Sequence, residues 1–228
     1  MSRSRNDAPL PPPLPPETRT VGQLVAETIK LYGRHVWLAL AIGLAPAVLD
    51  LVATELTRRE ALVFVPLVGG PVLTAAFIAA SVAALDAKPG RRSLVTAFLV
   101  GVLVFLPFPF FASVFILPGL VWLAFVGLSV PAAVVEGTGL AASLRRGVEL
   151  GRADFVHALG SLAALAIIVF LTRAMLFVLL QGFGESTERA ASFLADLVVS
   201  PLLFLGAALL YADQAARVGS APRARRSR

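Results

Sequence analysis

Long runs of apolar residues, separated by short polar stretches, occupy most of the chain from position 36 onward. A helix needs about 20 consecutive apolar residues to cross about 30 Å of hydrocarbon. The pattern therefore predicts an all-α integral membrane protein with one membrane domain over residues 20–216. We expect its six transmembrane helices at about 36–54, 61–85, 93–115, 119–136, 155–180 and 190–212.

The apolar run 93–135 is too long for one crossing and must contain a turn. LPG at 117–119 is the best turn signal, and LPFPF at 106–110 is the alternative. A Gly-Arg dipeptide precedes the first, third and fifth spans, at 33–34, 90–91 and 151–152. We interpret the six spans as three helical hairpins, each preceded by a flexible glycine and an arginine that anchors the span at the headgroups.

Two polar stretches flanking the spans have helical periodicity. In the segment 20–34, Thr20 and Gln23 form a capping-box pattern, and apolar residues recur on one side. In 139–152 the apolar stripe consists of Leu140, Leu144, Gly147, Val148 and Gly151. We expect both stretches to be amphipathic helices lying in the headgroup plane on the cytoplasmic face, apolar side down.

The composition agrees with a protein embedded in lipid. Hydrophobic residues make up 57% of the chain and charged residues 15%, against about 25% charged residues in soluble domains. The chain has no cysteine, which excludes disulfides and thiolate metal sites. The proline-rich residues 1–19 predict a disordered tail, and residues 217–228 form a basic tail.

The distribution of Lys and Arg predicts the orientation. The terminal arms, the 86–92 loop and the 137–154 segment carry 16 of the 20 basic residues, and the loops on the other side carry three. Positive charge stays on the cytoplasmic side of a membrane. We expect a bacterial cytoplasmic membrane protein with both termini in the cytoplasm and anionic lipid, not nucleic acid, as its partner. The arginines expected at the headgroups are Arg34, Arg91, Arg145, Arg146 and Arg152.

Charged residues inside a span are costly and mark either a structural pair or a functional site. Arg173 and Asp196 lie at similar depth in the fifth and sixth spans, so they are predicted to pair, with Asp50 as a second candidate partner. Such a group either holds the hairpin together or forms a polar site open to the outside. On the cytoplasmic side, Asp213 lies one helical turn from Arg217, and Glu136 ends a span. These three residues are candidates for interfacial salt bridges.

Motifs that would indicate chemistry are missing. The sequence contains no nucleophile elbow, no phosphate-binding glycine loop and no HExxH. Its two histidines, His35 and His157, have no cysteine or paired carboxylates beside them and make a poor metal site. We therefore expect no catalytic residue, no metal and no cofactor.

The segment VPAAVVEGTGLAASLRRGVELGRADF, residues 130–155, resembles the multi-span membrane domains of bacterial glycerophosphodiester phosphodiesterases and their uncharacterised free-standing relatives. VGQLVAETIKLYGRH at 21–35 and LLYADQAAR at 209–217 support the resemblance. It implies a six-span bundle with interfacial elbows. Only about 16 residues follow the last predicted span, so we expect no phosphodiesterase domain and transfer no catalytic residue.

Three functions follow from these features. The leading hypothesis is a non-enzymatic membrane protein, a lipid-interacting scaffold or the subunit of a membrane-protein or homo-oligomeric assembly. The second is a small transporter or export component whose polar site is Arg173 with Asp196. The third is an intramembrane lipid-modifying enzyme that uses Glu136 or Asp213 as a general base, which the nearby arginines disfavour because they keep carboxylates ionised.

Overall fold

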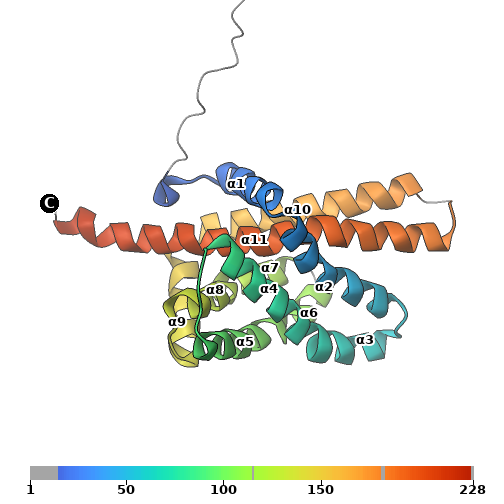
Figure 1. Cartoon of the computed structure of the whole chain (residues 1–228), viewed down its shortest axis with the longest axis horizontal. Coiled ribbons are helices and arrows are strands. Elements are labelled where there is room, and N and C mark those ends of the chain that lie inside the picture. Colours follow the sequence, from blue (N-terminus) through green and yellow to red (C-terminus); the bar gives the residue numbers. More distant parts are fainter. Residues whose placement is uncertain (1–14, 115, 181–182, 227–228) are drawn as a thin grey trace, which may run out of the picture.

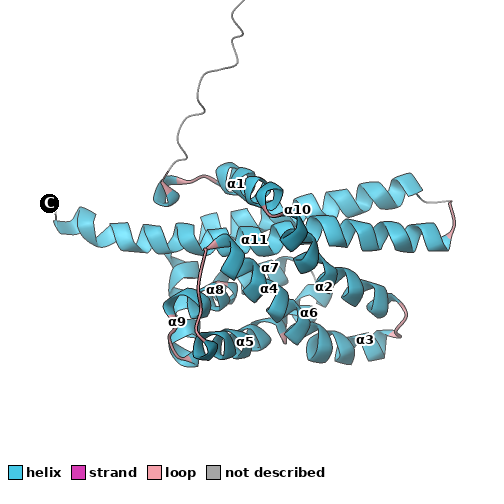
Figure 2. Cartoon of the chain, in the orientation of Figure 1, coloured by secondary structure: helices cyan, strands magenta, loops and turns pink. Residues whose placement is uncertain are grey.

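A computed structural model describes residues 15–114, 116–180 and 183–226, and every regular element in these ranges is a helix (Figures 1 and 2). The prediction of an all-α protein is therefore confirmed. In chain order the elements are η1 (Pro16–Thr18), α1 (Val21–Arg34), α2 (Val36–Thr54), α3 (Arg58–Phe64), η2 (Val65–Gly69), α4 (Gly70–Ala84), α5 (Arg91–Phe105), α6 (Phe108–Val114), α7 (Ile116–Trp122), η3 (Leu123–Gly127), α8 (Ser129–Glu136), α9 (Leu140–Ala153), α10 (Phe155–Leu180) and α11 (Glu185–Arg226).

Within the described ranges, six helical stretches are long and apolar enough to cross a membrane, as predicted. The second stretch passes through one π-helical turn, η2, without interruption, whereas the fourth passes through η3 and a turn at Leu128 before α8. Pro66 lies in the first of these turns, where the wider helix accommodates it. The six stretches are Val36–Thr54, Arg58–Ala84, Arg91–Phe111, Ile116–Glu136, Phe155–Leu180 and Ser186–Gly219.

Consecutive spans pack against each other in pairs: α2 with α4, α5 with α8, and α10 with α11. The last span, α11, also lies along α2 and α4, which closes the bundle between its first and last spans (Figure 1). Gly43 of α2 permits this contact. A Cβ atom at that position would lie 2.8 Å from the carbonyl carbon of Leu197 and 2.9 Å from Cγ of Pro201. Small residues allow such close approach where lipid supplies no hydrophobic driving force between helices.

The aromatic part of the core lies where α4, α5 and α11 meet. Phe77 packs against Phe105 edge to face, with ring centroids 6.1 Å apart, and against Phe204 at 6.0 Å. All three rings are buried. These contacts connect the second, third and sixth spans, so the predicted hairpins form one bundle and are not independent units.

The preferred turn signal between the third and fourth spans was wrong. Residues 117–119 lie inside α7, and Pro118 is in the first turn of that helix, where the missing N–H costs no hydrogen bond. The chain instead bends at Leu106 and Pro107, within the alternative signal LPFPF. It reverses between α6 and α7, which pack against each other; Phe115 between them lies outside the described residues.

The predicted boundaries of the two tails also differ from the structure. Residues 1–14 lie outside the described ranges, but η1 and Arg19 pack on α11 and belong to the folded domain. At the other end, α11 continues as a helix to Arg226, so position 216 is not a structural boundary. The capping box of Thr20 and Gln23 is present and begins α1 as expected.

Candidate functional site

The N-terminal arm and the C-terminal part of α11 lie at the same end of the bundle (Figure 1), and Arg19 and Asp213 form an ion pair there. Helix α9 lies across this end. It follows a sharp reversal after α8, at which Gly137 has a left-handed φ of 62° that favours glycine. The reversal brings the arginines of α9 back towards the end of α8 and the side of α11.

One face of α9 packs on the protein itself. A Cβ atom at Gly147 would lie 2.5 Å from the backbone nitrogen of Ser129, and a Cβ atom at Gly151 would lie 3.0 Å from Cα of Phe125. Both glycines are buried. The stripe that we expected to lie on lipid is therefore divided, because its glycines contact α8 and η3 while Leu140 stays exposed.

Glu136 connects three helices at this end. Its carboxylate accepts a hydrogen bond from Nε of Arg146 at 3.0 Å and another from the hydroxyl of Tyr211 at 3.0 Å. Arg146 also pairs with Glu149, at 3.1 Å. Burial lowers the pKa of Arg146, but the hydrogen bonds to the two carboxylates outweigh burial and hold the pKa above its ordinary value. Arg146 is thus bound by carboxylates of the protein, whereas we expected it to contact lipid headgroups.

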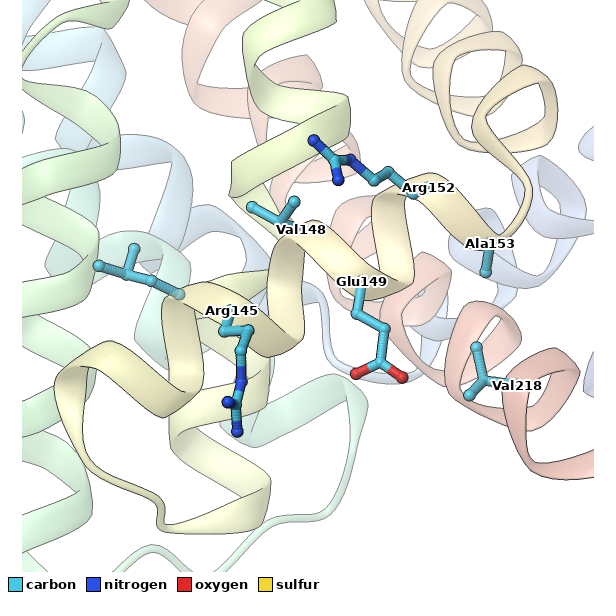
Figure 3. A pocket seen from close by; sticks show the side chains of 7 residues that line it. Arg145, Val148, Glu149, Arg152, Ala153 and Val218 are labelled. Carbon is cyan, nitrogen blue, oxygen red and sulfur yellow. The ribbon is translucent and has the colours of Figure 1, made fainter.

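A groove of about 640 Å³ runs between α9 and α11 next to this cluster (Figure 3). Arg145 and Arg152 extend from opposite sides of α9, and Val218 faces α9 from α11. Both arginines are exposed and form no ion pair with any described residue. The groove combines two available guanidinium groups with a mainly apolar wall. Its lining residues are Leu144, Arg145, Val148, Glu149, Arg152, Ala153 and Val218.

A second cluster ties the two ends of the chain together. Nη1 of Arg19 lies 2.6 Å from Oδ1 of Asp213, which is completely buried. Arg217 donates to Asp154 at 2.7 Å and to the backbone carbonyl oxygen of Arg19 at 2.8 Å. Asp154 also accepts a hydrogen bond from the backbone N–H of His157 at 3.1 Å and so caps the start of α10. Asp213 and Arg217, expected to pair with each other, each have a partner far away in the sequence.

Sequence reasoning missed Arg19 and Asp154 as members of this cluster. Their partners lie 194 and 63 residues away, beyond any local spacing rule. The one available signal was their position, because each precedes the start of a helix, where polar side chains often bind backbone or neighbouring elements.

At the opposite end, Arg173 bridges three spans. Its guanidinium lies 2.9 Å from Oδ2 of Asp50 on α2 and 3.0 Å from Oδ1 of Asp196 on α11. The Asp196 side chain is 4% exposed and that of Asp50 is 33% exposed. A groove of about 250 Å³ is lined by Asp50 and Glu188, but neither Arg173 nor Asp196 lines it.

The remaining candidates are separate from these clusters. Arg34 ends α1 and Arg91 begins α5; both are exposed and form no ion pair with a described residue. His35 lies exposed between α1 and α2, whereas His157 is buried on α10. Among the described residues, no group of three or more His, Asp or Glu side chains is placed to hold a metal ion.

Comparison with protein-family models, with curated proteins and with solved structures finds no match for this chain.

Proposed function

We propose that this protein is a non-enzymatic lipid-interacting scaffold or partner subunit in a bacterial cytoplasmic membrane, and that the groove between α9 and α11 binds the headgroup of an anionic phospholipid. One observation carries the proposal. Arg145 and Arg152 flank an apolar groove without carboxylate partners, whereas the neighbouring Arg146 is paired with Glu136 and Glu149.

The chemistry of the groove matches a phospholipid at the membrane surface. Guanidinium groups bind phosphate oxygens through parallel N–H donors. Leu144, Val148 and Val218 offer apolar surface to the glycerol region and the first acyl carbons. Glu149 also lines the groove, and its ion pair with Arg146 offsets its repulsion of an anion.

The distribution of charge supports an inner-leaflet location. The N-terminal arm, the 85–90 loop, α9 and the C-terminal part of α11 lie at one end of the bundle (Figure 1). These segments carry most of the basic residues, and anionic lipid is concentrated in the cytoplasmic leaflet. We infer that α1 and α9 are amphipathic helices at the headgroup level, with Arg34 and Arg91 as further lipid contacts.

Lipid retention tests the proposal directly. The protein, purified in mild detergent, is titrated with phosphatidylglycerol or phosphatidylcholine, and bound lipid is counted by native mass spectrometry. We expect selective retention of phosphatidylglycerol. The double variant Arg145→Gln, Arg152→Gln should weaken it about tenfold or more, because each arginine near a membrane surface contributes about 1 kcal/mol.

The matched control is Arg58→Gln with Arg59→Gln, which removes two exposed arginines from the opposite end of the bundle. This control should retain phosphatidylglycerol like the unchanged protein. Equal retention of both lipids, or equal loss in the two double variants, would contradict the proposed site.

A transporter or export component is the second candidate, and the charged group of Arg173, Asp50 and Asp196 favours it. Two carboxylates share one guanidinium among the spans, where charged groups are costly and are usually functional. The adjacent groove stops short of Arg173, which supports the scaffold more than a transport path.

The catalytic alternative gains no support from Glu136 and Asp213, because both are bound by arginines. The resemblance to phosphodiesterase membrane domains remains a prediction compatible with the scaffold.

A further inference from the structure

His157 and Asp213 face each other inside the protein without forming a hydrogen bond. Nε2 of His157 lies 3.9 Å from Oδ2 of Asp213, and both side chains are at least nine-tenths buried. Neither atom has a hydrogen-bond partner among the described residues. Two more buried polar atoms beside them in sequence, Oγ of Ser161 one turn along α10 and Oε1 of Gln214 on α11, also have none.

The unsatisfied carboxylate oxygen is the costly member of this group. A buried carboxylate is stable only where hydrogen bonds and opposite charge replace its lost hydration. Arg19 satisfies Oδ1 of Asp213, and Oδ2 is left facing the imidazole. A protonated imidazole carries N–H on both nitrogens and would supply the missing donor with a positive charge.

The charged neighbours of His157 are few. Arg19 lies on the N-terminal arm, Asp154 precedes α10, and Asp213 and Arg217 lie on α11. These four residues already form two arginine–aspartate ion pairs. His157 is therefore the titratable residue of this cluster that lies outside both pairs.

The other helices that pack on α10 bring no further charge into the buried side of the cluster. The buried face of α1 consists of Leu24, Thr28 and Leu31, and its Glu27 pairs with Lys30 at the surface. Helix α7 and turn η3 contain no titratable residue, and Arg152 near the end of α9 is exposed.

We propose that His157 and Asp213 form a proton-binding site that controls how firmly the N-terminal arm, residues 15–19, is attached to α11. This site is independent of the lipid groove and of the function proposed above. A proton from the aqueous side binds the imidazole, and Nε2–H then donates to Oδ2 of Asp213. The imidazolium then competes with Arg19 for the same carboxylate and repels the guanidinium, so the arm is held less firmly. When the proton returns to water, the full charge of the carboxylate acts on Arg19 and the arm is fixed.

The sign follows from the charge of the imidazole. Histidine is the side chain that ordinarily changes charge between pH 5 and 8. A protonated imidazole is a second cation on the carboxylate that holds Arg19, and it is favoured where Arg19 is absent, so attachment weakens as the pH falls and strengthens as it rises. The arm therefore responds to the pH on its own side of the membrane.

Spin labels on two cysteines test the proposal, because the chain contains no cysteine of its own. The label sites are Thr18 on the arm and Gly219 on α11, which are both exposed. The protein is placed in phosphatidylcholine nanodiscs, which keep surface charge constant, and the distance distribution is measured at pH 5.5 and pH 8. We expect a narrow distribution at pH 8 and, at pH 5.5, a detached population about tenfold larger, as for the loss of one charge-assisted hydrogen bond.

His157→Gln should give the same distribution at both pH values, and His157→Phe should do so as well, since neither variant can bind the proton. The matched control is His35→Gln, which removes the exposed second histidine and should keep the full pH response. An unchanged distribution in the parent protein between the two pH values would overturn the proposal. A pH response that survives His157→Gln, or one of opposite sign, would overturn it equally.

Discussion

Nη1 of Arg19 lies 2.6 Å from Oδ1 of Asp213, although 194 residues separate the two in the sequence. The contact fixes the segment before α1 to the last helix of the bundle. Because Asp213 is completely buried and Arg19 is 12% exposed, the pair is largely shielded from water. The two ends of the membrane domain are therefore joined by a desolvated ion pair.

Removing one partner of this pair should destabilise the protein strongly. We expect Asp213→Asn to lower the free energy of unfolding by about 3 kcal/mol, because it leaves the charge of Arg19 buried without its counter-ion. The effect is measured as the change in thermal unfolding in detergent. Glu27→Gln is the matched control, since it breaks an exposed pair with Lys30 that contributes at most about 0.5 kcal/mol. A loss no larger than that of the control would contradict the structural role of Asp213.

The packing of α9 on the bundle makes a second prediction. Gly147→Ala should lower the free energy of unfolding by about 1–3 kcal/mol, because the added methyl group meets the backbone of Ser129 and α9 must move away. Gly22→Ala in α1 is the control. Nothing lies within 4 Å of a Cβ atom there, and alanine favours a helix by about 1 kcal/mol over glycine. Thermal unfolding should thus shift in opposite directions in the two variants, and a shift of the same sign would disagree with the observed contact.

The number of spans was predictable because a bilayer imposes a minimum length on an apolar helix. The turn after the third span was not, because proline ends a helix in one context and begins one in another. Pro118 lies in the first turn of α7, and the bend falls at Pro107. A proline-containing segment has a similar composition whether it begins a helix or ends one. Only the packing of α6 on α7 shows which of the two applies here.

The arginines of α9 show a further limit of sequence reasoning. Arg145 and Arg146 are adjacent and identical in composition and local charge, so periodicity assigned both to the lipid surface. In the structure Arg146 pairs with Glu136, ten residues earlier, and Arg145 lines the groove. The reversal at Gly137 decides which of the two meets the carboxylate, and its geometry is not readable from composition.

The hydroxyl of Tyr211 supplies a third prediction. Tyr211→Phe removes the hydrogen bond to Glu136 while it keeps the ring, so we expect a loss of about 1 kcal/mol in the free energy of unfolding. Chemical unfolding in detergent provides the measurement. The chain contains one other tyrosine, Tyr32, for which no hydrogen bond of the side chain is found among the described residues. Tyr32→Phe should therefore be close to neutral, and equal effects of the two substitutions would speak against the Glu136 contact.

Asp50 and Asp196, the two carboxylates that pair with Arg173, should differ in their contributions to the free energy of unfolding. Asp196→Asn leaves the guanidinium beside the more exposed Asp50 and removes the 4% exposed partner, whereas Asp50→Asn keeps the buried pair. We expect Asp196→Asn to cost about 2–3 kcal/mol and Asp50→Asn under about 1 kcal/mol, because the desolvated pair depends on its partner more than the solvated one does. The two losses are compared by thermal unfolding in the same detergent.

A double substitution then separates a structural pair from a functional one. Arg173→Leu combined with Asp196→Leu removes both desolvation penalties together, so its stability should lie above that of Asp196→Asn and near that of the unchanged protein. If the pair only holds α10 against α11, this double variant should also keep the lipid retention measured for the groove at the other end of the bundle. Substrate transport that disappears in a folded double variant would instead assign Arg173 and Asp196 to a path through the membrane, and the scaffold proposal would give way to the transporter.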